Sequence, residues 1–105
     1  MAINYKNYLT KGITTSTTVY NPTAANTQAT IIGMIVANNT ANSVTANVTL
    51  TSGATTANIV YGVTIPTGTS LNVINSDRLI IEQNDSVAVA ATGSVDVIVS
   101  SIEVT

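Results

Sequence analysis

The sequence predicts an all-β fold, and we expect a single antiparallel β-sandwich, Ig-like or jelly-roll-like, of about eight strands. The chain holds 19 Thr, 13 Val and 12 Ile but 4 Leu, and β-branched residues favour strands over helices. Apolar and polar residues alternate along most of the chain, as they do in strands with one buried face. Clusters of Gly, Pro, Asn, Asp and Ser interrupt this alternation every roughly 8–12 residues, which is typical of a sandwich.

The composition excludes several classes of function. At 105 residues the chain is expected to form one domain. It has no Cys and no His, so it lacks a thiol nucleophile, a disulfide framework and the commonest general base and metal ligand. Its three Lys and Arg residues are too few for nucleic acid, and no apolar run approaches the ~20 residues that span a bilayer. We expect no enzyme, no cofactor, no metal, and neither nucleic acid nor membrane as a partner.

The first twelve residues differ from the rest of the chain. Their periodicity is poor, so we expect an irregular N-terminal arm at 1–12, followed by the sandwich domain at 13–105. The arm lacks a charged segment followed by an apolar one, so we expect no signal peptide. It carries two of the four tyrosines and two of the three cations.

Two interpretations of this arm stay open. It could pack Ile3, Tyr5 and Leu9 onto its own domain, or it could reach a neighbouring subunit. Aromatic side chains are favoured interface anchors, because each buries a large area with few rotors to freeze. The candidate interface residues are Tyr5, Lys6, Tyr8 and Lys11.

The alternation places the expected strands in order along the chain. They lie within the segments 13–19, 29–38, 44–50, 59–65, 71–73, 79–81, 87–89 and 95–104. The most apolar segment, 29–38, predicts a central strand buried on both faces. In the last strand the apolar residues shift from odd to even positions after Val99, which predicts a β-bulge at Ser100–Ser101. This strand must be held in a sheet, and we expect it to be central in the chain's own sheet.

Turn residues separate these strands. Pro66–Thr69 predicts a tight turn, since Pro presets φ and Gly accepts a positive φ. Asn75, Asp77, Asn84 and Asp85 offer oxygen atoms that could bind Ca²⁺, but the segment lacks the spaced acidic pattern of known Ca²⁺ loops. We therefore interpret Asp85 as a turn residue that bonds backbone N–H groups.

A few residues suggest chemistry beyond folding. The five carboxylates, which a hydrolase would need in pairs, are Asp77, Glu82, Asp85, Asp96 and Glu103. Exposed aromatic residues stack sugars in carbohydrate-binding sandwiches. Tyr61, however, shares the phase of Ile59, Val63 and Ile65, so we expect it to pack in the core.

Several segments of the sequence, here called phrases, resemble segments of small virion structural proteins of tailed bacteriophages, notably those of marine and cyanobacterial phages. These phrases cover most of the chain in a consistent order: Tyr5–Asn7, Gly33–Asn38, Ile65–Val73, Leu79–Val89 and Val95–Thr105. Where such proteins often have Gly before the Asp of the fourth phrase, this chain has Asn84, which also tolerates a positive φ. The resemblance implies a part of the virion without catalytic residues, whose partners are other virion proteins of the capsid, neck or tail.

The sequence thus predicts a non-enzymatic phage virion structural protein, a multi-copy accessory or decoration subunit that forms a homo-oligomer. Low charge supports this, since nearly uncharged subunits repel one another little at close packing. The alternative is a sandwich module that recognises a host surface glycan or protein. A hydrolase that uses the acidic turns is a third hypothesis.

Overall fold

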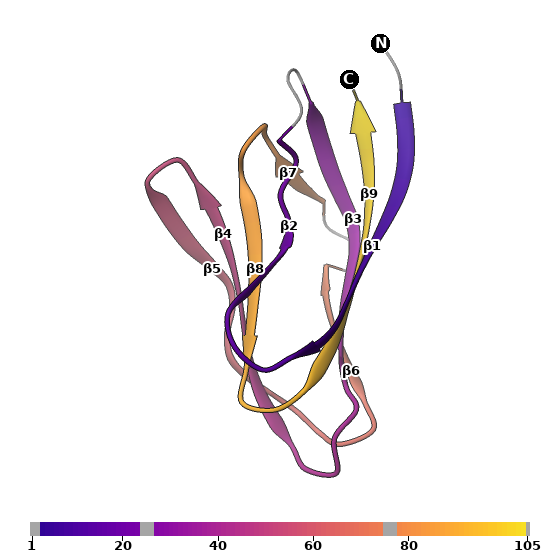
Figure 1. Cartoon of the computed structure of the whole chain (residues 1–105), viewed down its shortest axis with the longest axis vertical. Helices are drawn as coiled ribbons and strands as arrows, with labels where there is room; N and C mark the ends of the chain where they lie inside the picture. Colours follow the sequence, from indigo (N-terminus) through magenta and orange to yellow (C-terminus); the bar gives the residue numbers. More distant parts are fainter. Residues whose placement is uncertain (1–2, 24–26, 75–77, 105) are drawn as a thin grey trace.

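The computed structural model describes residues 3–23, 27–74 and 78–104. These residues form nine strands and no helix (Figure 1). The strands are β1 (Ile3–Ile13), β2 (Thr17–Tyr20), β3 (Gln28–Asn38), β4 (Val44–Ser52), β5 (Thr55–Ile65), β6 (Ser70–Ile74), β7 (Leu79–Ile81), β8 (Ser86–Ala91) and β9 (Val95–Val104). The strands pair in two antiparallel sheets that face each other, so the predicted all-β sandwich is confirmed.

The strand order is that of a jelly roll. The first sheet has the order β1-β9-β3-β6, with β7 also paired to β3, and the second sheet has the order β2-β8-β4-β5. Consecutive strands from β1 to β4 therefore alternate between the sheets, whereas an immunoglobulin sandwich places its first two strands in one sheet. The C-terminal strand β9 lies between β1 and β3, as expected for a central strand.

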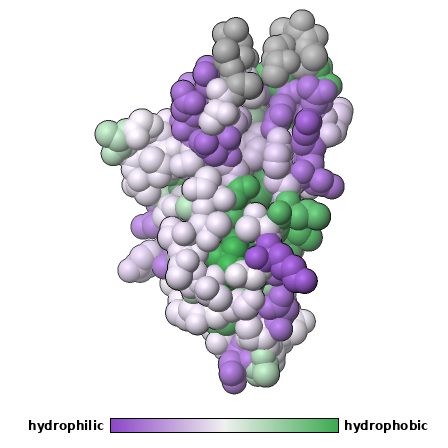
Figure 2. Space-filling model, viewed as in Figure 1, coloured by the Kyte–Doolittle hydropathy of each residue, from purple (hydrophilic) through white to green (hydrophobic). Residues whose placement is uncertain are grey.

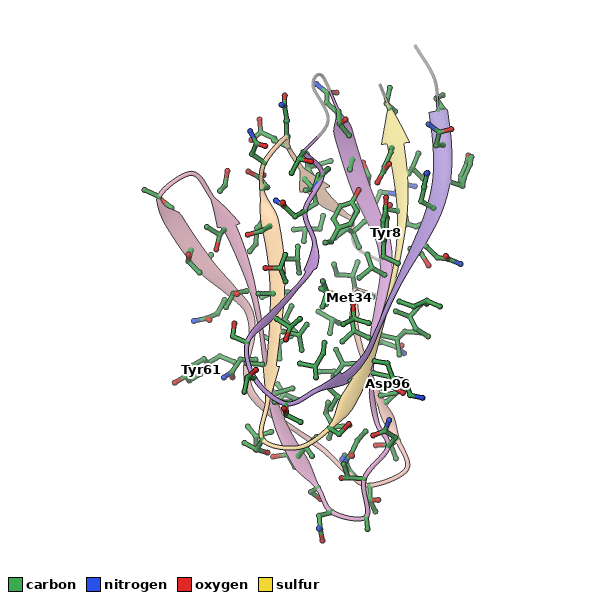
Figure 3. The ribbon with its side chains drawn as sticks, viewed as in Figure 1. Tyr8, Met34, Tyr61 and Asp96 are labelled. Carbon is green, nitrogen blue, oxygen red and sulfur yellow. The ribbon has the colours of Figure 1, made fainter. Side chains whose placement is uncertain are left out.

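The core lies between the two sheets and consists mainly of Val and Ile. The longer central strands contribute alternate residues, as period-2 geometry requires, whereas β2 buries the consecutive Val19 and Tyr20 at its register shift. In β9, for example, Val95, Val97 and Val99 are buried. Met34 on β3 is fully buried at the centre (Figure 3), where a flexible thioether fills space between branched side chains.

The turns follow the predicted chemistry. Asn84 has φ 70° and Gly68 has φ 71°, so both adopt the left-handed conformation expected of them. The Asp85 carboxylate accepts a hydrogen bond from the Glu82 backbone N–H at 2.9 Å, which confirms its role as a turn residue. Asn75 and Asp77 lie outside the described residues.

The N-terminal segment is not irregular, and that prediction was wrong. It forms strand β1, which pairs with β9 from Ile3↔Val104 to Ile13↔Val95. The interpretation that Ile3, Tyr5 and Leu9 pack onto their own domain was also wrong, because all three are exposed. The predicted strand 13–19 is divided, since the chain leaves the first sheet after Ile13 and enters the second at Thr17.

The predicted bulge at Ser100–Ser101 lies on the neighbouring strand instead. Strand β9 keeps one phase, so Ser101 is buried on the same face as Val99. The extra residue is Ile32 of β3, because Ile31 pairs with Ser101 and Gly33 pairs with Ser100. The apolar residues at even positions of β9 therefore do not enter the core.

Tyr61 does not pack in the core, contrary to its predicted phase. Strand β5 contains an extra residue opposite Asn47, since Val63 pairs with Ala46 and Val60 pairs with Val48. Gly62, with φ 67°, makes this bulge, and its N–H donates to the Asn47 Oδ1 at 2.6 Å. A bulge reverses the faces on its far side, so Tyr61 points away from the sandwich (Figure 3) and is 76% exposed.

Candidate interaction surface

The first sheet presents an apolar surface to solvent. We call this surface, which faces away from the second sheet, the outer face. Among the described residues, eight large hydrophobic side chains are exposed, and seven of them lie on the outer face: Ile3, Tyr5, Leu9, Ile32, Ile35, Ile80 and Ile98. Tyr61 of β5 is the eighth. In Figure 2, exposed hydrophobic residues lie midway along the β1 side, with hydrophilic residues above and below them.

Strand register arranges the outer face in rows across the sheet, because directly paired residues share a face. The Tyr5 row contains Tyr5, Ile102, Thr30 and Ile80. The Leu9 row contains Leu9, Ile98, Ile35 and Asn72. Between them lies the Ser100 row, Asn7, Ser100 and Gly33, whose side chains are smaller. Two rows of larger residues therefore flank a row of smaller side chains, which we call the trough, and the bulge residue Ile32 of β3, 38% exposed, lies beside Gly33 at its edge.

Charged groups lie at the ends of this surface. Lys11 and Asp96 line a hollow of about 270 Å³ below the Leu9 row. The Asp96 carboxylate accepts hydrogen bonds from the Gly12 N–H and the Asn39 Nδ2, both at 2.9 Å. At the opposite end, Glu82 lines a pocket of about 530 Å³ beside Gln28 and Ile80. An apolar centre with a polar rim is the usual anatomy of a protein interface.

The four predicted interface residues divide between two faces of β1. Tyr5 is 77% exposed on the outer face, and Lys11 lies at its lower end. Lys6 is exposed but belongs to the opposite phase, since it pairs with the buried Ser101. Lysines on a free edge strand also hinder unwanted strand pairing, so the position of Lys6 has a structural explanation.

Tyr8, unlike Tyr5, points inward and its hydroxyl binds its own chain. Its hydroxyl donates to the Glu103 Oε2 at 2.6 Å, and the Tyr20 hydroxyl donates to the same oxygen at 2.7 Å. The two tyrosine rings contact each other, with centroids 4.9 Å apart. This cluster joins β1, β2 and β9, and it closes the sandwich at the β1–β2 edge.

The cluster alters the acidity of both phenols. Burial, the hydrogen bond to Glu103 and the charge of Glu103 raise the pKa of Tyr8 to about 12. Burial also raises the pKa of Tyr20 above its ordinary value, with Glu103 adding to the effect and the Ser101 hydroxyl opposing it. Ser101 lies on the core side of β9, in phase with Val99, and its buried Oγ has no hydrogen bond of good geometry to any described group.

The carboxylates that the structure describes are used within the fold or lie apart from one another. Asp85, Asp96 and Glu103 accept hydrogen bonds from the chain's own groups. Within residues 3–23, 27–74 and 78–104, no group of three or more acidic residues could hold a metal ion. The same residues contain no helix that is long and apolar enough to cross a membrane.

The sequence interpretation missed most of the outer face. Ile32 and Ile35 were assigned to a strand buried on both faces, but none of the residues that the structure describes covers the second face of β3. The signal was present in the sequence, because β3 is apolar at both odd and even positions. One domain of this length supplies two sheets and therefore one covered face per sheet.

Comparison with known proteins finds a likeness of fold. No family model matches the chain, and no curated protein matches it significantly. A solved structure does match, from Bacillus endospore appendages described as a novel family of disulfide-linked pili, with a TM-score of 0.55 and 15% identity. The match covers 99% of this chain and 87% of that chain. At this identity the likeness concerns the fold alone, and this chain has no Cys with which to form a disulfide.

Proposed function

We propose that this chain is a non-enzymatic structural subunit of a phage virion, present in many copies on the capsid, neck or tail. Within this proposal we prefer decoration of the capsid. One observation carries it: seven of the eight exposed large hydrophobic residues in the described chain lie on one sheet face. Soluble monomers rarely expose contiguous apolar patches of this kind, and larger ones mark interaction sites.

Two further features support an assembly role. The segments from Tyr5–Asn7 to Val95–Thr105 resemble phage virion proteins in sequence and order. The jelly roll also occurs in viral capsid proteins, although it occurs in lectins too, and a fold alone does not define a function. The chain carries 8% charged residues and a formal net charge of −2, so copies crowded on a particle repel one another little. Binding would be non-covalent, through apolar contacts.

The test is reconstitution on particles that lack this protein. Purified full-length chain is titrated against such particles, and bound protein is measured after sedimentation. We expect saturable binding at a fixed number of copies per particle. If the chain does not sediment with the particles and binds a polysaccharide instead, the virion proposal is wrong.

Tyr61 favours a second candidate, a module that binds a host surface glycan. This side chain is 76% exposed on the edge strand β5, and exposed aromatic rings offer apolar faces on which sugars can stack. Screening against host polysaccharides tests it, with Tyr61→Ala as the variant. Binding that Tyr61→Ala abolishes would support this candidate, and no binding to any host polysaccharide would exclude it.

A further inference from the structure

The outer face has the size of a protein–protein interface. A fully exposed large apolar residue presents roughly 180 Å², so the seven outer-face residues expose on the order of 700 Å². A stable interface of standard size buries about 800 Å² per partner. The outer face alone therefore approaches the area that one partner contributes, and its polar rim adds to this area.

The order of the rows would let two outer faces interdigitate along β1 and β9, while the bulge residue Ile32 of β3 fills part of the trough near the axis. The Tyr5 row and the Leu9 row project on either side of the Ser100 row, which contains Gly33. A two-fold axis across the strands, between the Tyr5 and Ser100 rows, would place the Tyr5 row of each copy in the other's trough. The same axis would place Leu9 and Ile98 over Ile3 and Val104, which also face outward.

The charges permit such a pairing. No Lys, Arg, Asp or Glu is a member of the Tyr5, Ser100 or Leu9 rows. Lys11 and Asp96, one of each sign, lie outside the contact, and Arg78 and Glu82, also one of each sign, flank β7 at its edge. The formal net charge of the whole chain is −2. Two identical outer faces therefore meet without placing like charges in the apolar centre, where an unpaired charge would be costly.

We propose that the outer face of one copy packs against the outer face of a second copy, which makes a two-fold symmetric dimer. Such an interface is isologous, so each contact between two different rows occurs twice, once on each side of the axis. Sheets that pack face to face lie about 10 Å apart with interdigitated side chains, as the rows require. The proposal deepens the proposed function and rests on its premise that the outer face is covered in the working protein.

Sedimentation velocity of the full chain, from micromolar to near-millimolar concentration, tests this dimer. We expect a reversible dimer whose Kd rises at least about 100-fold in the Leu9→Asp, Ile98→Asp double variant, because each copy would bury unpaired carboxylates. Tyr61→Asp is the matched control, since Tyr61 and Leu9 are similarly exposed on edge strands. Circular dichroism and thermal melts verify that each variant is folded.

Because the chain has no Cys, a single introduced cysteine can report the distance between the two copies by cross-linking. Ser100→Cys lies beside the proposed axis, and a short bismaleimide should link it into dimers, while Thr64→Cys on the second sheet should stay unlinked.

A monomer at every concentration, open-ended association, or equal Kd values for the outer-face and Tyr61 variants would each overturn the dimer. Particle binding by a wild-type monomer would leave the virion function intact. A dimer that binds no particle would support the dimer and contradict that function.

Discussion

The Tyr8 hydroxyl donates a 2.6 Å hydrogen bond to the carboxylate of Glu103, which lies 95 residues away in the chain. This contact joins edge strand β1 to central strand β9 from the inside, while their outward side chains stay exposed. Tyr20 donates to the same oxygen from β2. Glu103 therefore accepts from one tyrosine of each sheet, and hydrogen bonds to a charged group are stronger than neutral ones.

Removing these hydroxyls should destabilise the fold. We expect Tyr20→Phe to lower the free energy of unfolding by about 2 kcal/mol, because a charge-assisted hydrogen bond is lost at a buried side chain. Tyr8→Phe should cost about 1 kcal/mol, since Tyr8 is half-exposed. Urea denaturation measures both. Tyr5→Phe is the control, and an equal effect from Tyr5→Phe would contradict the role of the cluster.

The same cluster predicts a loss of stability at high pH. The folded state holds the pKa of Tyr8 at about 12, above the ordinary value of 10.0. The unfolded chain therefore releases this proton first, and the stability that the protonated phenol provides is complete below pH 10. It should decline as the pH rises from about 10 towards 12. Denaturation midpoints across this range provide the measurement. The Tyr8→Phe, Tyr20→Phe double variant should show a flatter profile, and an identical slope would argue against the assignment.

Asn38 should contribute more to stability than its neighbour Asn39. The buried Asn38 amide donates to the carbonyl oxygens of Asn42 and Ile65, and its Oδ1 accepts from the backbone and side chain of Thr40. Asn38→Ala should cost about 2–3 kcal/mol, because buried polar groups lose their partners. Asn39→Ala removes one exposed hydrogen bond to Asp96 and should cost under about 1 kcal/mol. Thermal melts of the two variants compare them directly, and equal Tm values would be inconsistent with this assignment.

Gly93 should resist even the smallest enlargement. A Cβ at this position would lie 2.6 Å from the Val44 Cγ1 in the core. Gly93→Ala should therefore destabilise by about 1–3 kcal/mol through overpacking. At Gly33 an added Cβ meets contacts of 3.9 Å and longer, so Gly33→Ala serves as the control and should change the unfolding midpoint little. Full tolerance of Gly93→Ala would show that β4 moves to make room.

The strands of the second half of the chain could be predicted well from alternation. Val87, Val89, Val95, Val97 and Val99 are buried as their phase required. The turn at Asn84 adopts its predicted conformation, because short-range backbone chemistry determines it. Period and turn residues are local properties, so they are visible without knowledge of the fold.

Bulges and uncovered faces could not be predicted in the same way. Tyr61 was misplaced because the bulge at Gly62 reverses the phase of β5, and a single Gly in a strand does not reveal its φ. The bulge opposite Ser100 was assigned to the wrong strand, since the register depends on the neighbouring strand as well. The contact of Tyr8 with Glu103 was not foreseen, because the two residues lie 95 positions apart in the chain. Each error came from pairing that only the tertiary structure determines.

The central claim is that the outer face is covered when the protein works. Single cysteines test it most directly, with Leu9→Cys on the outer face and Tyr61→Cys on the second sheet, at positions 71% and 76% exposed in the free chain. Maleimide labelling rates are measured on the dilute chain and on particles that carry it. We expect labelling of Leu9→Cys to slow at least about tenfold on particles while Tyr61→Cys stays reactive. Equal labelling of Leu9→Cys in both states would contradict the account.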